Sequence, residues 1–184
     1  MKNLIIISGD LAAGKSTLAN SLSAELKIPA LTKDSLKEVA CDAIGYKNRE
    51  ENRQLSIAAV DAMIYVFMQT AKVDGDIILE ANFRNDEIYR IKEIADEYNY
   101  DVVLIYLTGD FNLLYQRFLD RLSTRHIAHK SLNLDCSLDS FISYLQQIRN
   151  EDLLYPMNTI DMTYLDEDEV VDEALNIIHT SLGI

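Results

Sequence analysis

The sequence has few of the residues that characterise disulfide-rich, disordered or fibrous proteins. Its 184 residues include two cysteines, two prolines, six glycines and no tryptophan. Cys41 and Cys136 are far apart and belong to no CxxC motif or Cys/His spacing, so we expect reduced thiols and neither a disulfide nor a metal site. The low glycine and proline content and the 48% hydrophobic residues exclude a low-complexity chain and indicate a folded globular protein.

Long hydrophobic segments are also missing from the N-terminal region. Residues 1–10, MKNLIIISGD, contain one lysine and an apolar run of four residues. Such a run is too short for the core of a signal peptide and far too short for a membrane span. We therefore expect a cytoplasmic protein without a membrane partner.

Basic residues are in the minority. The chain carries 17 Lys and Arg residues against 30 Asp and Glu residues, which gives a formal net charge of -13. This charge repels a phosphodiester backbone unless basic residues gather at one place, so a nucleic-acid partner is not expected. The length is typical of one domain, and no repeat or linker interrupts it. Residues 1–184 are therefore expected to form a single domain, whose oligomeric state the sequence does not indicate.

The hydrophobic pattern predicts strands and helices that alternate along the chain. Short apolar runs predict strands at 3–8, 29–32, 76–81, 101–107 and 159–165. Apolar residues at helical spacing predict helices at 15–27, 33–45, 55–68, 86–99, 111–121, 141–154 and 167–182, with a loop at 132–138. The helix at 55–68 is nearly all apolar and is expected to be largely buried. This alternation indicates an α/β fold with a parallel sheet of about five strands and helices on both faces.

The segment GDLAAGKS at residues 9–16 matches the motif GxxxxGK[ST] and lies between a predicted strand and a predicted helix, as the motif requires. Its glycines let successive N–H groups turn toward a phosphate, and the helix N-terminus adds positive potential. Lys15 is expected to reach the β and γ phosphates and Ser16 to bind Mg²⁺, while Thr17 could hold the α phosphate. The expected ATP site comprises Gly9, Asp10, Leu11, Ala12, Ala13, Gly14, Lys15, Ser16 and Thr17. The alternative is a glycine-containing turn with a solvated lysine.

An aspartate follows the predicted second strand. Ligands of an open parallel sheet gather beyond the carboxyl ends of its strands, so Asp34 is expected near the γ phosphate. Its carboxylate could accept the proton of an attacking hydroxyl group. The alternative is that Asp34 caps the helix that follows, whose start is marked by Asp34 or Ser35.

An acidic residue also ends the third predicted strand. The aliphatic residues 77–79 precede Glu80, an arrangement that resembles a Walker B strand whose terminal acid holds Mg²⁺ or its water. Aspartate is commoner than glutamate at that position. Because many buried strands end in a polar residue, Glu80 could contact the metal, contact the substrate or do neither. Asn82 and Arg84 lie just beyond, where a phosphate acceptor would bind.

Three arginines stand out in this acidic chain. Arg117, Arg121 and Arg125 are spaced four residues apart, which predicts one basic ridge along a helix. We interpret residues 117–137 as a lid in which Arg121 and Arg125 close over the transferring phosphoryl group, stabilise its charge and exclude water. The alternative is a solvated helical face whose arginines pair with Asp120 and neighbouring acids.

Two histidines lie in the same segment. His126 and His129 are three residues apart, a spacing that could bind a metal ion. The sequence offers no third ligand nearby, so a metal site is not expected there.

The motif at 9–16, Asp34 and the arginine-bearing helix together resemble the P-loop kinases of the nucleoside monophosphate and shikimate kinase type. Within this superfamily the chain is most similar to the branch that contains chloramphenicol phosphotransferase, polynucleotide 5′-kinase and the zeta toxins. In that branch an aspartate acts as the base and a basic residue follows three positions later, as Lys37 does here, where polynucleotide kinases carry arginine. The resemblance implies a three-layer α/β/α fold with strand order 2-3-1-4-5, a small helical lid, Mg-ATP as donor and a hydroxyl-bearing acceptor.

These features predict an ATP-dependent kinase that acts on a small molecule. The catalytic residues expected are Lys15, Asp34, Arg121 and Arg125, the substrate-binding residues are Asp34, Lys37, Glu80, Asn82 and Arg84, and the metal ligands are Ser16 and Glu80. One alternative is a toxin-like kinase of polynucleotides or nucleotide conjugates, against which the acidic charge argues. Another is a nucleotide-binding switch that hydrolyses ATP slowly. The acceptor itself does not follow from the sequence, because specificity resides in pocket geometry.

Overall fold

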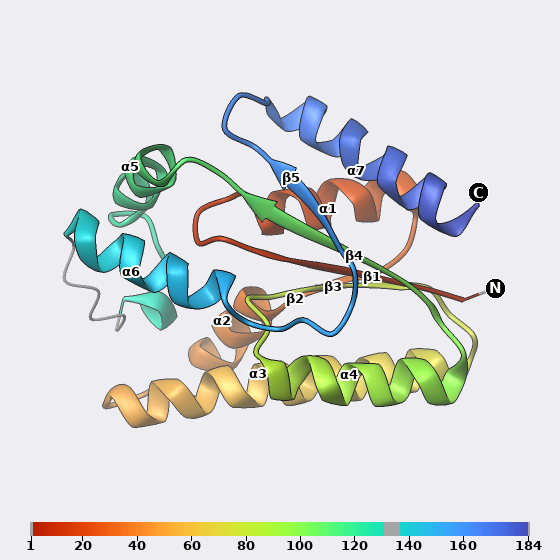
Figure 1. Cartoon of the computed structure of the whole chain (residues 1–184). Coiled ribbons are helices and arrows are strands. Elements are labelled where there is room, and N and C mark those ends of the chain that lie inside the picture. The colour runs from red at the N-terminus through yellow and green to blue at the C-terminus, as the bar shows by residue number, and fades with distance from the viewer. Residues whose placement is uncertain (1, 131–136, 184) are drawn as a thin grey trace.

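The computed structural model describes residues 2–130 and 137–183, and its centre is a five-stranded sheet (Figure 1). The strands are β1 (Asn3–Gly9), β2 (Ala30–Thr32), β3 (Ile77–Glu80), β4 (Asp101–Thr108) and β5 (Met157–Asp161). They lie in the order β2-β3-β1-β4-β5, and every neighbouring pair is parallel. The predicted α/β class and the strand order 2-3-1-4-5 are confirmed.

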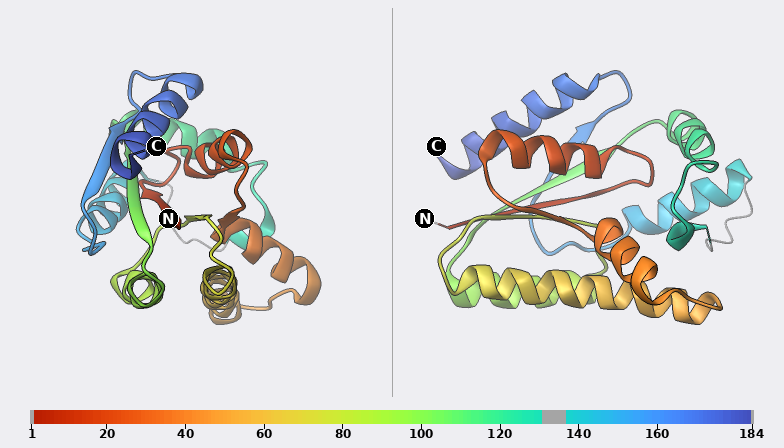
Figure 2. Two further views of the ribbon diagram at one scale, coloured as in Figure 1. Left: turned by 90° about the vertical axis from the view of Figure 1, so that its right-hand side faces the viewer. Right: turned by 180° about the vertical axis from the view of Figure 1, so that it is seen from behind.

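Helices cover both faces of the sheet and make a three-layer structure. They are α1 (Lys15–Leu26), α2 (Lys33–Ile44), α3 (Arg49–Ala71), α4 (Asn85–Tyr98), α5 (Phe111–Arg121), α6 (Leu138–Arg149) and α7 (Glu167–Leu182), with the short 3₁₀ helix η1 (Ile127–His129). Figures 1 and 2 show α1 and α7 on one face of the sheet and α3 and α4 on the other.

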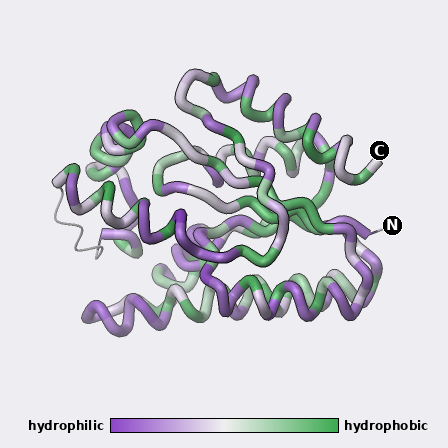
Figure 3. The backbone as a smooth tube through the Cα atoms, in the orientation of Figure 1, coloured by the Kyte–Doolittle hydropathy of each residue, from purple (hydrophilic) through white to green (hydrophobic). Residues whose placement is uncertain are grey.

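The side chains of β1 divide the hydrophobic core into two parts. Ile5 and Ile7 belong to a buried cluster with residues of α1 and α7, whereas Leu4 and Ile6 belong to a cluster with residues of α3 and α4. Successive side chains of a strand point to opposite faces, so a strand covered on both sides must be apolar throughout. Figure 3 shows the resulting concentration of hydrophobic residues in the central strands.

The helix predicted at 55–68 is longer and less buried than expected. α3 begins at Arg49, and its first turn is capped by the side chain of Asn48. One face of α3 packs against β1 and β3, but Ile57, Tyr65 and Val66 on its other side are exposed. The prediction of a largely buried helix was therefore wrong, because an apolar residue does not have to face the core. By length and composition alone, α3 would be apolar enough to cross a membrane.

Asp34 does not cap α2. The chain passes from β2 into α2 without a loop, so Thr32 occupies the N-cap position and Asp34 lies in the first turn of the helix. The prediction that Asp34 or Ser35 marks the start of this helix was wrong, because the extended backbone already ends at Thr32. Asp34 therefore lies both just beyond the carboxyl end of β2 and in the first turn of α2.

Two elements near the C-terminus begin earlier than the pattern predicts. α6, predicted at 141–154, begins at Leu138 because the side chain of Ser137 caps its first turn. β5, predicted at 159–165, begins at Met157 and ends at Asp161. The carboxylate of Asp161 accepts a hydrogen bond from the N–H group of Thr163, where the chain turns away from the sheet. Apolar periodicity marks the buried face of an element and not the polar groups that end it.

Part of the predicted loop and lid lies outside the described residues. This applies to residues 131–136, which lie within the predicted lid 117–137 and include residues 132–136 of the predicted loop 132–138, and hence to Cys136. Cys41 is a buried free thiol. The described part of the predicted lid consists of the end of α5 and the segment that leads through η1.

Gly9 ends β1 at a point where β4 comes very close. Its φ is 132°, and a Cβ atom at this position would lie 2.1 Å from the carbonyl oxygen of Leu107. The N–H group of Asp10 donates to the same carbonyl at 2.8 Å. Only glycine fits here. The contact between the two strands therefore fixes where the loop after β1 leaves the sheet.

We expect Gly9→Ala to lower the free energy of unfolding by about 3 kcal/mol, because the added methyl group would overlap the backbone of Leu107 at an unfavourable φ. Urea denaturation of the variant and the wild type measures the difference. Gly183→Ala is the control, since Gly183 also has a positive φ, 67°, but open space where a Cβ would lie. It should cost about 1 kcal/mol. Equal losses in the two variants would contradict the overlap.

Candidate active site

The loop between β1 and α1 has the geometry expected of a phosphate-binding loop. Ala12 and Gly14 have φ values of 65° and 86°, so the backbone turns through the left-handed region twice. α1 begins directly after Gly14, and no side chain caps the N–H groups of its first turn. Uncapped N–H groups at a helix N-terminus are donors for an anion.

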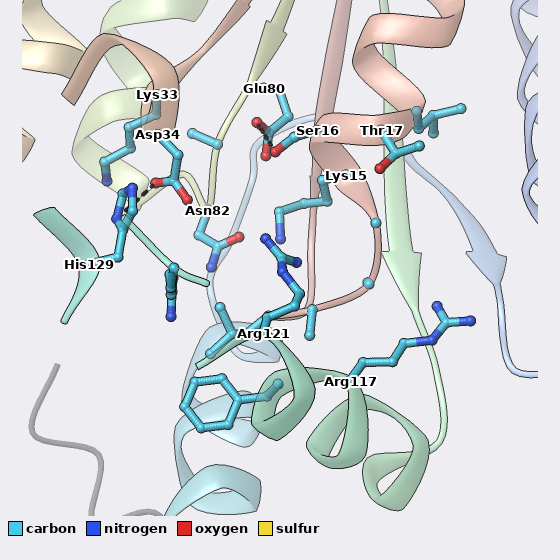
Figure 4. A pocket seen from close by; sticks show the side chains of 18 of the residues that line it. Lys15, Ser16, Thr17, Lys33, Asp34, Glu80, Asn82, Arg117, Arg121 and His129 are labelled. Carbon is cyan, nitrogen blue, oxygen red and sulfur yellow. Dashed lines mark hydrogen bonds and ion pairs between the residues drawn. The ribbon is translucent and has the colours of Figure 1, made fainter. Parts of the chain in front are cut away.

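A cleft of about 1320 Å³ lies over this loop and brings most of the predicted site residues together (Figure 4). It is lined by Leu11, Ala12, Ala13, Gly14, Lys15, Ser16 and Thr17 of the loop and by Asp34, Lys37, Glu80, Asn82, Arg84, Arg117, Arg121 and Arg125 from elsewhere. Gly9 and Asp10, which the sequence assigned to the nucleotide, do not line it.

Lys15 lies buried in the wall of the cleft. Its Nζ donates to the carbonyl oxygen of Asp10 at 2.6 Å. Burial lowers the pKa of Lys15, while the carboxylates of Glu80 and Asp34 act in the opposite direction. An ammonium group with so little access to water needs anionic neighbours. The position is therefore suited to a phosphate group beside the loop.

The side chain of Asp10 anchors the loop from behind. It is fully buried, and its carboxylate accepts hydrogen bonds from Nε of Arg149 at 3.0 Å and from the hydroxyl of Thr108 at 2.9 Å. Arg149 also donates to the carbonyl oxygen of Gly109 at 2.9 Å and lies over the ring of Phe111, 4.4 Å from its centroid. This network joins the loop to the end of α6. No local sequence pattern indicates this network, because Asp10 and Arg149 are 139 positions apart.

Glu80 and Ser16 offer two adjacent oxygen atoms in the cleft. The hydroxyl of Ser16 donates to Oε2 of Glu80 at 3.1 Å. Glu80 is buried, and burial raises its pKa, while Lys15 lowers it. Within residues 2–130 and 137–183, no three His, Cys, Asp or Glu side chains are grouped to hold a metal ion. The two oxygens fit Mg²⁺, which takes few protein ligands and completes its shell with phosphate and water.

Asp34 lies on the opposite side of the cleft from the loop, with its side chain exposed (Figure 4). Oδ1 of Asp34 is 3.9 Å from Nδ1 of His129. Lys37, one turn later on α2, is buried, and its Nζ donates to Oδ1 of Asn52 on α3 at 2.7 Å. Burial lowers the pKa of Lys37, and Asp34 acts against this. Lys37 thus lines the cleft while it holds α2 and α3 together.

Asn82 and Arg84 follow β3 on the same side of the cleft as Asp34. The Oδ1 atom of Asn82 is buried and has no hydrogen-bond partner among the described residues. Arg84 donates to Glu151 at 2.7 Å, and this hydrogen bond raises its pKa. The two predicted acceptor contacts therefore differ: Asn82 has a vacant acceptor atom, whereas the guanidinium of Arg84 is already paired.

The predicted ridge of three arginines was wrong. α5 ends at Arg121, so only Arg117 and Arg121 share a helix, and Arg125 lies in the non-helical segment beyond it. Figure 4 shows Arg121 pointing toward Lys15 and Arg117 pointing away from it. Nη1 of Arg117 lies 3.3 Å from the sulfur of Met162.

The arginines do not pair with surface acids in the way the alternative interpretation requires. Asp120 accepts a hydrogen bond from Gln116 at 2.9 Å. No carboxylate of the described residues lies within 4.0 Å of Arg117, Arg121 or Arg125 as an ion-pair partner. Burial lowers the pKa of Arg125, and Asp34 raises it. Arg121 and Arg125 therefore keep their guanidinium groups available in the cleft.

The two histidines bind carboxylates of α2. Nε2 of His126 lies 3.1 Å from Asp42, and Nε2 of His129 lies 2.9 Å from Glu38. Among the described residues, no three His, Cys, Asp or Glu side chains gather around these histidines so as to hold a metal ion. No sequence pattern places His129 beside Asp34.

Positive charge concentrates in the cleft. Nine of the 17 Lys and Arg residues line it, namely Lys15, Lys33, Lys37, Arg49, Arg53, Arg84, Arg117, Arg121 and Arg125. The acidic residues that line it are Asp34, Glu80, Asp120, Asp166 and Glu167. A chain with a net charge of -13 thus carries a locally basic cleft, which attracts phosphate groups.

Comparisons with known proteins identify the family and the fold. The AAA domain family model matches residues 5–135. Among solved structures, the protein named "putative kinase" from Chloroflexus aurantiacus superposes with a TM-score of 0.80 at 26% identity, covering 95% of this chain and 97% of its own. No curated protein sequence matches the chain.

Two further solved structures share the fold. Shikimate kinase from Bacteroides thetaiotaomicron has a TM-score of 0.63 at 14% identity, with 99% of each chain covered. A gluconokinase from Sinorhizobium meliloti has a TM-score of 0.62 at 15% identity, with 98% of this chain and 94% of that chain covered. The fold is that of P-loop kinases.

We expect Arg149→Met to lower the free energy of unfolding by about 3 kcal/mol, because the buried carboxylate of Asp10 loses its charged partner. Chemical denaturation at pH 7 measures the loss. Arg90→Met is the matched control, since Arg90 pairs with Asp61 at the exposed surface. Its effect should stay below about 1 kcal/mol. An equally small effect of Arg149→Met would show that the buried pair does not hold the loop.

Proposed function

The chain belongs to the AAA domain family and to the P-loop kinase superfamily, and we propose that it is an ATP-dependent phosphotransferase. The γ-phosphoryl group of Mg-ATP passes to a hydroxyl group of a small-molecule acceptor. The observation that carries this proposal is the shared cleft. It joins an uncapped phosphate loop, an exposed carboxylate at Asp34 and two available arginines.

The loop side of the cleft is suited to the donor. The N–H groups at the start of α1 and the ammonium of Lys15 would hold the β and γ phosphates, and Thr17 would lie at the α phosphate. The oxygens of Ser16 and Glu80 would hold Mg²⁺, which when bound neutralises phosphate charge.

The far end of the cleft is suited to the base of the nucleotide. Apolar side chains of Met162, Leu165, Val170 and Val171 line it beside the guanidinium of Arg117. Apolar surface and a planar cation both pack well against an aromatic ring.

The opposite side of the cleft is suited to the acceptor. Asp34 would take the proton of the attacking hydroxyl group. The unpartnered Oδ1 of Asn82 would accept a hydrogen bond from a second polar group of the acceptor. Lys37 and Arg84 are engaged with protein groups, so their part would be to shape this side of the pocket.

Two arginines are suited to the transferring group itself. Phosphoryl transfer needs little covalent help from the protein, so positioning and charge stabilisation supply most of the rate. Arg121 points toward Lys15 (Figure 4), and Arg125 lines a small pocket together with Asp34, whose charge acts on its guanidinium. Together they would cover the γ phosphate while it passes between donor and acceptor.

We propose that the protein carries out this reaction in the cytoplasm.

A label-transfer assay tests the reaction class. Wild-type protein is incubated with γ-labelled ATP and a panel of sugars, sugar acids, nucleosides and antibiotics that carry hydroxyl groups, and in parallel with oligonucleotides and nucleotide conjugates that carry a 5′-hydroxyl group. We expect label on at least one acceptor. Lys15→Ala should lose the phosphate contact and Asp34→Asn the base, so each should lower transfer at least about 100-fold. Lys72→Ala and Asp172→Asn, at exposed sites outside the cleft, are the matched controls.

The same assay separates the alternatives. Label only on the 5′-hydroxyl of nucleic acids or nucleotide conjugates would favour a polynucleotide-type kinase. ATP loss without any labelled acceptor, and unchanged in Asp34→Asn, would favour a slow hydrolytic switch. Either result would contradict the small-molecule proposal.

We expect Glu80→Gln to raise the Mg²⁺ concentration for half-maximal activity about tenfold. Burial raises the pKa of Glu80, so its carboxylate takes up a proton at a higher pH than an exposed glutamate. The wild type should therefore need more Mg²⁺ as the pH falls from 7 toward 5, and the variant should show no such trend. Mg²⁺ titrations at several pH values check this. A variant that keeps the wild-type pH dependence would contradict the assignment of Glu80.

A further inference from the structure

The helix η1 places a histidine directly behind the proposed base. His129 is 7% exposed, and its Nδ1 lies 3.9 Å from Oδ1 of Asp34 (Figure 4). Its Nε2 lies 2.9 Å from Oε1 of Glu38, one turn further along α2. The imidazole therefore lies between two carboxylates, and Asp34 is the one that lines the large cleft.

The segment that carries this histidine is fixed to α2 and α3. The side chain of Asn52 donates to the carbonyl oxygen of Ala128 at 2.9 Å. The hydroxyl of Tyr46 donates to the carbonyl oxygen of Ile127 at 2.8 Å. Ala128 is completely buried. These contacts hold the ring of His129 in one place relative to Asp34, as a supporting residue requires.

Charged groups face the imidazole from both elements packed against it. They are Asp34, Lys37 and Glu38 of α2, and Arg125 and His126 of the segment before η1. Burial lowers the pKa of His129 most strongly, and Arg125 and Lys37 act in the same direction. Asp34 and the hydrogen bond to Glu38 act against this. The ring is therefore neutral at pH 7.

Resting on the proposed function, we propose that His129 is a positioning residue for Asp34 and receives the proton that Asp34 takes from the acceptor. The carboxylate of Glu38 can only accept a hydrogen bond, which assigns the ring proton to Nε2. The lone pair of Nδ1 then faces Asp34.

The proposed phosphoryl transfer and the proton transfer through Asp34 and His129 conserve protons and electron pairs. The O–H bond of the acceptor breaks, and its proton binds a carboxylate oxygen of Asp34. The acceptor oxygen forms a bond to the γ phosphorus, and the bond from that phosphorus to the bridging oxygen breaks with its electron pair left on ADP. The proton then passes from Asp34 to Nδ1 of His129, where Glu38 balances the imidazolium, and finally leaves to water.

The distance between the two groups suits this role. A separation of 3.9 Å is longer than a hydrogen bond, and a shift of about 1 Å closes it. The side chain of Asp34 is 53% exposed and can rotate. The contact becomes attractive once Asp34 is protonated, because the Nδ1 lone pair then meets an O–H group and no longer a carboxylate. An interaction that strengthens along the reaction lowers its barrier.

The first test needs no catalysis. NMR titration of protein with ¹⁵N-labelled histidine rings gives the tautomer and the pKa of His129. We expect the Nε2–H tautomer at pH 7 and a pKa below the ordinary 6.5. Asp34→Asn and Glu38→Gln should each lower this pKa further, because each removes a negative charge beside the ring. A pKa that does not move in Asp34→Asn, or an Nδ1–H tautomer, would overturn the proposal.

The second test uses the acceptor identified by label transfer. His129→Gln can still donate to Glu38 but has no basic atom toward Asp34, so kcat should fall roughly tenfold with an unchanged KM for ATP. In the wild type, kcat should fall as the pH drops through the pKa of His129, because a charged ring cannot take the proton and makes Asp34 a weaker base. In His129→Gln this fall should move to lower pH. His126→Gln, the matched control in the same segment, should keep the wild-type acid limb.

The outcomes separate the two proposals. A His129→Gln variant with the wild-type pH profile would overturn the role of His129, even if its kcat or stability is lower. A wild-type protein that transfers no label to any acceptor would overturn the proposed function, and with it the role of His129. A titration that shows no coupling to Asp34, in a protein that does transfer label, would overturn only the role of His129.

Discussion

The parallel pairing of β1 with β3 and β4 is the constraint on which the candidate site depends. Ile7 pairs with Glu80 across one side of β1, and Gly9 pairs with Leu107 across the other. Because all strands run in the same direction, their carboxyl ends meet at one edge of the sheet. This edge gathers the phosphate loop, Asp34 and Glu80. Ser16 and Glu80, 64 positions apart, come within hydrogen-bond distance there.

The sequence predicts the fold and the position of the loop at residues 9–16 well, because both depend on local patterns. A strand buried on two faces is a continuous apolar run, and the motif at 9–16 carries its own requirement for a strand before it and a helix after it. The positions of Asp34 and Glu80 then follow from strand direction alone. Element ends were predicted less well, since they depend on features that periodicity does not register, such as the direct passage from β2 into α2 at Thr32 and the side-chain cap of Ser137.

The remaining parts of the site depend on which distant segments meet, and no local pattern carries that information. Asp10 was expected in the nucleotide site as part of the loop, and its carboxylate binds Arg149 at the end of α6. The spacing of the arginines predicted one ridge, but α5 ends at Arg121, and Arg125 reaches the cleft from the segment docked on α2. His129 was considered only as a metal ligand. Its partner Glu38 is 91 positions away, so its neighbourhood became visible only in three dimensions.

The contrast between a basic cleft and an acidic exterior has a consequence for selectivity. A polyanion has to lie along the outer surface before one of its groups can enter the cleft. The protein carries 30 acidic residues, and those outside the cleft repel the polyanion along its length. A compact anion is repelled only while it approaches the cleft, and inside the cleft it is attracted by the lysine and arginine side chains. On electrostatic grounds this arrangement favours the entry of a compact anion over that of a polyanion, so it couples selectivity for charge to selectivity for molecular size.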